Sequence, residues 1–189
     1  MNAIKNIAAA ALLASGTAIF IPQTGWAQEP EAARALVGSR LVGEGTLRFL
    51  GFDIYRARLW VAPGFDANDY AAHPLALELT YHRGFSGEAI AKRSLEEMRR
   101  VGSFTPEQAA RWQQALQAAL PDVKSGDRLL GVYQPGTGAV FRMGGRVVGE
   151  VADAEFARLF FGIWLSPQTS EPALRQALIA SARNAGSPP

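Results

Sequence analysis

The chain has no cysteine, only two histidines, and almost no excess of charge of either sign. Without cysteine it cannot form disulfides, zinc–thiolate or iron–sulfur sites, or a cysteine nucleophile. His73 and His82 are too few for a multi-histidine metal cage. The 19 Lys and Arg residues against 17 Asp and Glu residues leave a net charge of +2. This argues against a nucleic-acid-binding protein, because such proteins carry a concentrated basic face. We therefore expect a globular domain whose chemistry depends on Arg, Lys, Tyr, Ser, Thr or carboxylates.

The common catalytic motifs are missing as well. The sequence contains no glycine-rich phosphate loop followed by lysine, no G-x-S-x-G elbow and no H-E-x-x-H pair. Gly43-x-Gly45 is too short a match to indicate dinucleotide binding. We interpret it instead as a tight strand bend or a close backbone approach. No residue pattern names a cofactor or a metal, and we expect none.

Residues 1–27 are typical of a secretory signal peptide. Lys5 supplies a positive start, residues 7–21 are mostly apolar, and small side chains lie where the signal peptidase would cut after Ala27. The apolar run is shorter than the ~20 residues needed to span a bilayer. We therefore predict export to the periplasm, no membrane span in the exported protein, and a single domain in residues 28–189.

Hydrophobic periodicity predicts an antiparallel sheet with helices on one face, an α+β arrangement. Alternation and turn signals predict strands at 40–48, 52–61, 75–82, 129–133, 139–143 and 146–151. Capping residues predict helices that begin after Ser86, Thr105 and Asp153, and a last helix is predicted over 172–180. Residues 28–37, which are polar and rich in alanine, are expected to pack loosely ahead of the fold.

Arg48 and Tyr55 are the residues whose chemistry and spacing point to a binding site. If Leu50-Gly51 is a short turn, the flanking strands run antiparallel and the two side chains could converge. A guanidinium presents a rigid fork of donors suited to a carboxylate or phenolate, and a tyrosine hydroxyl adds one more donor. Apolar neighbours would make this the polar end of an apolar pocket. The alternative is a surface arginine beside a tyrosine that packs in the ordinary way.

Several short sequence motifs follow one another in a characteristic order between residues 41 and 178. They are Leu41-x-Gly43-x-Gly45-x-x-Arg48, Asp53-Ile54-Tyr55-x-Ala57-x-Leu59-Trp60, Gly126-Asp127-Arg128-Leu129, Tyr133-x-Pro135-Gly136-x-Gly138, Phe156-Ala157-x-x-Phe160-Phe161-Gly162-Ile163-Trp164-Leu165 and Leu174-Arg175-x-x-Leu178. Together they resemble the bacterial chalcone isomerase-like proteins, relatives of plant chalcone isomerase and of plant fatty-acid-binding proteins. The resemblance implies an open-faced sandwich, with a large antiparallel sheet packed against a layer of helices and a ligand cleft between them.

The resemblance also implies ligand-binding roles for four residues. Arg48 corresponds to the family arginine that meets the anionic end of the ligand. Tyr55 corresponds to a position that is threonine in the isomerases and tyrosine in the fatty-acid binders. Phe104 lies where the isomerases have a tyrosine hydroxyl, and Leu159 where they have a threonine. Because those polar donors are absent, we expect binding without catalysis.

The function expected from these observations is binding of a small amphipathic anion, such as a fatty acid or a flavonoid-like molecule. Two alternatives stay open. One is a chalcone–flavanone isomerase type of intramolecular lyase, with Arg48 as the electrostatic catalyst. The other is a periplasmic structural or assembly protein that contacts a protein partner through an apolar helix face with Phe160 and Trp164.

Overall fold

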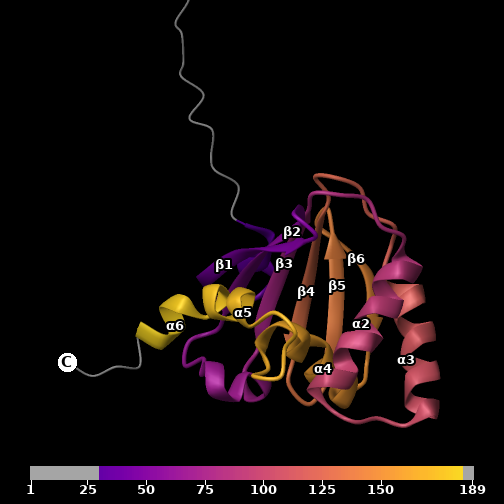
Figure 1. Cartoon of the computed structure of the whole chain (residues 1–189). Coiled ribbons are helices and arrows are strands. Elements are labelled where there is room, and N and C mark those ends of the chain that lie inside the picture. The colour runs from indigo at the N-terminus through magenta and orange to yellow at the C-terminus, as the bar shows by residue number, and fades with distance from the viewer. Residues whose placement is uncertain (1–29, 185–189) are drawn as a thin grey trace, which may run out of the picture.

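The computed structural model describes residues 30–184, so the predicted signal peptide lies outside the described residues. Their centre is a six-stranded antiparallel sheet whose strands follow one another in sequence order (Figure 1). The strands are β1 (Arg40–Phe49), β2 (Phe52–Val61), β3 (Leu75–Tyr81), β4 (Arg128–Gln134), β5 (Gly138–Met143) and β6 (Arg146–Val151). All six predicted strands are confirmed, and the α+β open-faced sandwich with them.

Three helices form a layer on one face of the sheet (Figure 1). They are α2 (Gly87–Val101), α3 (Pro106–Ala119) and α4 (Ala154–Leu165). Each begins at the predicted capping residue, because its side-chain oxygen accepts a backbone N–H of the first turn. Ser86 accepts from Ala89, Thr105 and Gln108 form a capping box, and Asp153 accepts from Phe156.

Helix α4 packs on the sheet through large aromatic side chains. The Phe160 ring lies 5.3 Å from that of Phe141 on β5, and the Phe161 ring 5.3 Å from that of Tyr133 on β4. Phe160 and Trp164 are only 5% and 7% exposed. The helix face proposed as an assembly surface therefore faces the interior, and the structure does not support contact with a partner through it.

A short helix covers the other face of the sheet. Helix α1 (Glu31–Ala35) buries Ala32 completely, and Glu31 accepts a hydrogen bond from Arg142 at 3.2 Å. Ala32 belongs to a second hydrophobic cluster, with Trp60, Ala76, Leu130 and Val132. The expectation of loose packing is wrong for residues 31–35, and the helices are not confined to one face of the sheet. The physical reason is that these strand residues are apolar on the outer face too and need a cover.

The C-terminal helices pack against the edge strand β1. Helices α5 (Pro172–Leu178) and α6 (Ala180–Asn184) both contact this strand. A side-chain carbon added to Gly43 would lie 2.2 Å from the carbonyl oxygen of Ala177. The interpretation of Gly43-x-Gly45 as a close backbone approach is thus confirmed. A 3-10 segment, η1 (Ala67–Ala72), lies between β2 and β3.

We expect Gly43→Ala to lower the free energy of unfolding by about 1–3 kcal/mol, because the added methyl group must displace helix backbone rather than a flexible side chain. Urea unfolding measures the change. The control is Thr46→Ala, an exposed position on the same strand. Equal midpoints for the two variants would contradict the close contact between β1 and the C-terminal helices.

Candidate functional site

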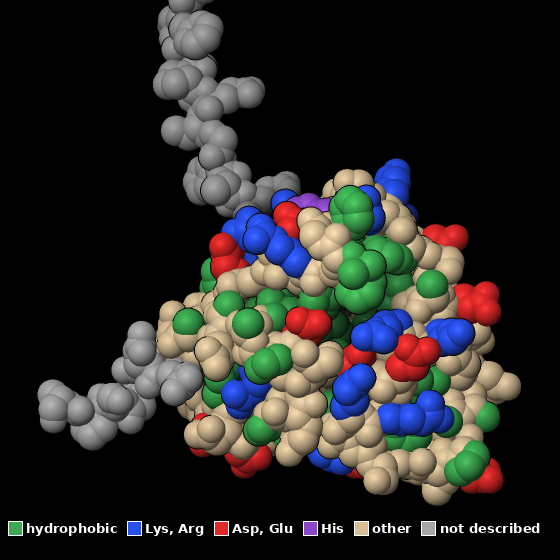
Figure 2. Space-filling model, in the orientation of Figure 1, with side chains coloured by type: hydrophobic (Ala, Val, Ile, Leu, Met, Phe, Trp, Pro, Cys, Tyr) green, Lys and Arg blue, Asp and Glu red, His purple; other side chains and the backbone are tan. Residues whose placement is uncertain are grey.

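A cavity of about 390 Å³ lies between the sheet and helices α2 and α4. It opens at the surface, because Phe49, Arg93 and Glu171 on its wall are exposed. Figure 2 shows hydrophobic side chains gathered around a hollow on this face. The apolar side chains of its wall are Leu47, Phe49, Ile54, Leu79, Phe85, Ala89, Ile90, Leu120, Leu129, Phe160, Ile163 and Trp164. Such a wall suits an apolar ligand or the apolar part of an amphipathic one.

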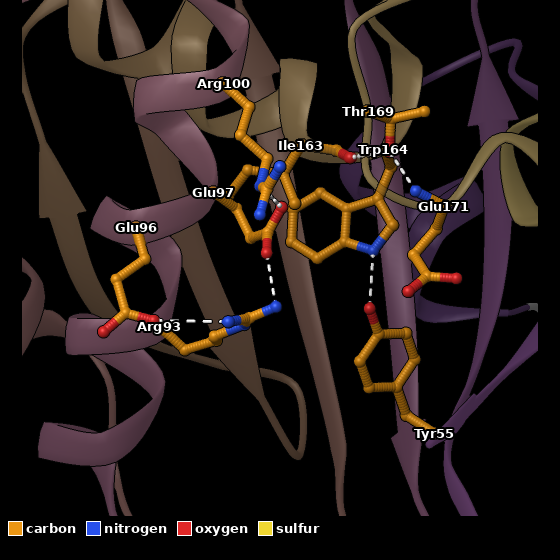
Figure 3. A network of polar contacts seen from close by, with 9 residues as sticks. All are labelled: Tyr55, Arg93, Glu96, Glu97, Arg100, Ile163, Trp164, Thr169 and Glu171. Carbon is orange, nitrogen blue, oxygen red and sulfur yellow. Dashed lines mark hydrogen bonds and ion pairs between the residues drawn. The ribbon is translucent and has the colours of Figure 1, made fainter. Parts of the chain in front are cut away.

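Two tyrosine hydroxyls lie on the mostly apolar wall. Tyr55 on β2 pairs with Tyr81 on β3, and their rings meet edge to face at 5.9 Å. The Trp164 indole N–H donates to the Tyr55 hydroxyl at 2.9 Å (Figure 3). Among the described residues, nothing accepts the Tyr55 hydroxyl hydrogen, and the Tyr81 hydroxyl makes no hydrogen bond. Two phenol donors are therefore free to meet a ligand.

Both phenols stay protonated over the physiological range. Burial raises the pKa of Tyr55 far above its ordinary value, and the hydrogen bond from Trp164 offsets only part of this. Burial also raises the pKa of Tyr81. A protonated phenol is a hydrogen-bond donor and carries no charge. The site can therefore donate to a ligand oxygen whether that oxygen is neutral or anionic.

Charged groups lie along the cavity wall near Tyr55 (Figure 3). The nearly buried Glu97 carboxylate forms ion pairs with Arg93 and, at 3.4 Å, with Arg100. Arg93 also contacts Glu96 at 3.2 Å. Glu171 lies across from Tyr55, and its carboxylate has no ion pair within residues 30–184. The wall thus carries one cation, Arg93, and two carboxylates, those of Glu97 and Glu171.

The structure does not bring Arg48 to Tyr55. Leu47 and Phe49 line the cavity, so the intervening Arg48 side chain points to the other face of β1. A register shift between Leu47 and Arg48 places Leu47 opposite Tyr55 and Arg48 opposite Asp53. The Arg48 side chain is 72% exposed and pairs with Asp53 at 2.7 Å. The expectation that the Arg48 and Tyr55 side chains converge is therefore wrong, although the predicted turn at Leu50-Gly51 is confirmed. Ligand binding by Arg48 stays a prediction.

Phe104 and Leu159 also lie away from the cavity. The Phe104 ring packs against Trp112 at 4.9 Å, with the Arg99 guanidinium 5.1 Å from its centre. Leu159 is fully buried where α4 meets Gly102, at the end of α2. Of the four predicted site residues, only Tyr55 lines the cavity. Roles for the other two in ligand binding also stay predictions.

Tyr81, Glu97 and Glu171 are site residues that the sequence did not single out. Tyr81 follows Leu75, Leu77 and Leu79 on the buried face of β3, so its period-two position was a usable signal. Glu97 lies three residues after the buried Ser94 and extends the buried stripe of α2. Glu171 lies in a loop whose position depends on tertiary contacts, and no local pattern indicates it.

These observations define a class of protein: an open-faced α+β sandwich with an apolar cavity beneath its helix layer. A family model described as chalcone isomerase-like matches residues 36–180. The chain belongs to this chalcone isomerase-like family.

One sequence match and one solved structure illustrate the range of the similarity. An uncharacterized protein of Haemophilus influenzae is 24% identical over 144 residues, which are 76% of this chain and 69% of that protein. The crystal structure of a fatty-acid binding protein from Arabidopsis thaliana superposes with a TM-score of 0.60 at 14% identity, over 77% of this chain and 89% of the other. At that identity the structural match shows a shared fold.

Residues 30–184 contain neither a metal-binding cluster nor a membrane-spanning helix. No group of three or more His, Asp or Glu side chains is arranged there to hold a metal ion. No helix in the same part of the chain has the length and apolarity to cross a bilayer.

We expect no tyrosine of the folded protein to ionise at its ordinary pKa. The chain has four tyrosines. Burial raises the pKa of Tyr70 to about 12 and also raises those of Tyr55, Tyr81 and Tyr133. The folded chain then keeps protons that the unfolded chain releases, so the free energy of unfolding falls as pH rises above about 10. Tyrosinate absorbance and circular dichroism, followed together, measure this. Tyrosinate that forms near the ordinary pKa while the fold stays intact would contradict it.

Proposed function

We propose that this protein binds a fatty acid or a similar amphipathic molecule in the cavity and does not catalyse a reaction on it. The observation that carries the proposal is the cavity itself, with apolar walls and two unpaired phenol donors. Its volume of about 390 Å³ lies within the range of small-molecule sites. The shared fold with a fatty-acid binding protein supports the same ligand class.

The apolar walls supply the affinity for the ligand tail. Leu79 and Leu129 on the sheet face Phe160 and Ile163 on α4 across the cavity. Each methylene group transferred from water to such surroundings contributes about 0.8 kcal/mol. An acyl chain therefore gains binding free energy with each carbon that the cavity encloses, until the cavity is filled along its length.

The phenols and Arg93 determine where the head group lies. Tyr55 and Tyr81 each offer one hydrogen, and Arg93 is the only Lys or Arg on the wall within the described part of the chain. A ligand carboxylate placed beside Tyr55 gains these donors, but it also approaches Glu171. Like charges repel, so the site favours a neutral head group, such as an alcohol or ester, over an acid of equal length.

Binding without chemistry agrees with the groups at hand. Both oxygens of the Glu97 carboxylate are engaged in ion pairs, one with Arg93 and one with Arg100. Phe104 has no hydroxyl to donate to a reacting carbonyl and lies away from the cavity.

From residues 1–27 we also propose export to the periplasm. Mass spectrometry of the N-terminus of the expressed protein tests this.

Tyr55→Phe is expected to weaken ligand binding about threefold to tenfold, because it removes one hydrogen-bond donor and leaves the ring in place. Isothermal titration calorimetry with a saturated fatty acid and the matching alcohol measures the loss. The control is Tyr133→Phe, which removes a phenol hydroxyl bonded to the Ala71 carbonyl outside the cavity. It should leave ligand affinity unchanged.

The Arg48→Ala variant distinguishes a ligand bound in the cavity from a ligand bound on the opposite face of the hairpin. The geometry leads us to expect unchanged affinity in this variant, because Arg48 does not line the cavity. If affinity falls in Arg48→Ala and holds in Tyr55→Phe, the ligand head group lies on the outer side of β1 and the cavity proposal is wrong.

Ile163→Trp is expected to abolish binding by filling the cavity from the α4 side. Ile163 is partly exposed and lines the wall, so the larger ring can occupy the cavity. Val147→Trp, at an exposed position on β6, adds the same ring away from the cavity. Circular dichroism shows whether each variant is folded. Full ligand binding by a folded Ile163→Trp variant would refute a ligand in this cavity.

A further inference from the structure

The turn between β1 and β2 exposes an apolar cluster at the end of the hairpin. Within this hairpin tip, residues 48–53, the exposed fractions of Phe49, Leu50 and Phe52 are 63%, 80% and 52%. Single exposed apolar residues are common, but large apolar side chains gathered at one projecting tip indicate a contact site. The core of the fold gains little from any of the three.

Leu50 is unfavourable in its backbone conformation as well as in its exposure. Its φ is 49°, and it is the only residue other than glycine with a positive φ in the described part of the chain. Gly51 follows at φ 81°. Two-residue hairpin turns of this kind usually contain Asn-Gly, because a leucine in the left-handed region is strained. Neither folding nor solubility accounts for leucine here, so its apolar side chain has another use.

Two arginines lie at the hairpin tip. The Arg83 guanidinium lies over the Phe52 ring, 4.1 Å from its centre. Arg48 is exposed and pairs with the tip's own Asp53, so Arg83 gives the tip its net positive charge. An apolar end with arginine behind it is the arrangement that proteins use at the interface of lipid head groups and acyl chains.

The hairpin tip also borders the mouth of the cavity. Phe49 belongs both to the exposed cluster and to the cavity wall, and Ile54 and Phe85 continue the wall inward. The hydrophobic surface seen around the hollow in Figure 2 lies on the same face. A surface that covers the tip would therefore meet the cavity opening.

We propose that the hairpin tip inserts into a lipid surface that carries anionic head groups. Phe49, Leu50 and Phe52 enter the boundary of the acyl chains, and Arg83 meets the phosphates. The cavity mouth then faces the lipid, and an apolar ligand can pass between the two with little exposure to water. The insertion itself does not rest on the proposed function, since it needs only the tip.

The test compares vesicle binding by the wild type and by Leu50→Asn, each expressed from the full 189-residue sequence. Vesicles of phosphatidylcholine with phosphatidylglycerol supply anionic head groups, and vesicles of phosphatidylcholine alone supply neutral ones. The variant should lose about tenfold in partitioning, because one buried leucine side chain contributes at least this much. Asparagine accepts a positive φ, so the unfolding midpoint should stay the same or rise. Loss of binding by misfolding is thereby excluded.

Val37→Asn is the matched control. Val37 is 88% exposed, and it lies just before the opposite end of β1 from the tip. It should leave vesicle binding unchanged. Since residues 7–21 are themselves mostly apolar, insertion is also measured at the tip, in a Leu50→Trp variant. Its fluorescence should shift to the blue with anionic vesicles and be quenched by brominated acyl chains.

Three results would overturn the proposal. They are equal vesicle binding by wild type and Leu50→Asn, a tip tryptophan that stays in water, and loss of a concentration-dependent dimer in Leu50→Asn without any lipid effect. The last would make the tip a contact between copies of the chain. Leu50→Asn should still bind a water-dispersed ligand, and Tyr55→Phe should still bind vesicles. The two variants therefore distinguish a failure of the lipid-insertion proposal from a failure of the ligand-binding proposal.

Discussion

The spacing between the sheet and its helix layer depends on the aromatic side chains of α4. Phe156, Phe160 and Phe161 pack as a continuous set of rings, and Phe160 also meets Trp164 at 5.5 Å. Rings of this size hold the helix away from the strands. The hydrogen bond from Trp164 to Tyr55 then ties the C-terminal half of α4 to β2. Toward the β1–β2 hairpin the layer is not filled, and the cavity occupies that part of it.

The polar groups of the cavity lie where these layers meet. The phenols come from two adjacent strands, the Arg93–Glu97 pair from α2, and Glu171 from the loop before α5. Cross-strand pairing therefore positions Tyr55 and Tyr81, whereas helix packing positions the charges around them. An amphipathic ligand would touch both parts of the fold. The hairpin that carries Leu47 and Phe49 on the cavity wall also carries the exposed cluster, which joins ligand binding to the proposed lipid contact.

Local patterns were sufficient for most of the architecture. Alternation predicted β3, and the capping residues predicted where α2, α3 and α4 begin, because these signals act over a few neighbouring residues. The five-residue helix α1 was missed, since its cover of Trp60 depends on contacts distant in sequence. Arg48 was misplaced for a similar reason. The turn fixes which strands pair, but the register shift beyond Arg48 skips Ile54 on β2 and puts Tyr55 on the face opposite to Arg48, and no residue pattern reveals that shift. Tyr55 was found from its hydroxyl donor, its position near the predicted turn and the family resemblance, none of which depends on the register.

A crystal structure of the protein grown with a saturated fatty acid or the matching alcohol would show where the ligand lies. We expect an acyl chain between Leu79 and Phe160, with a head-group oxygen within hydrogen-bonding distance of the Tyr55 hydroxyl. A cavity closed by its own side chains, or a ligand held on the outer side of the hairpin at Arg48, would contradict it.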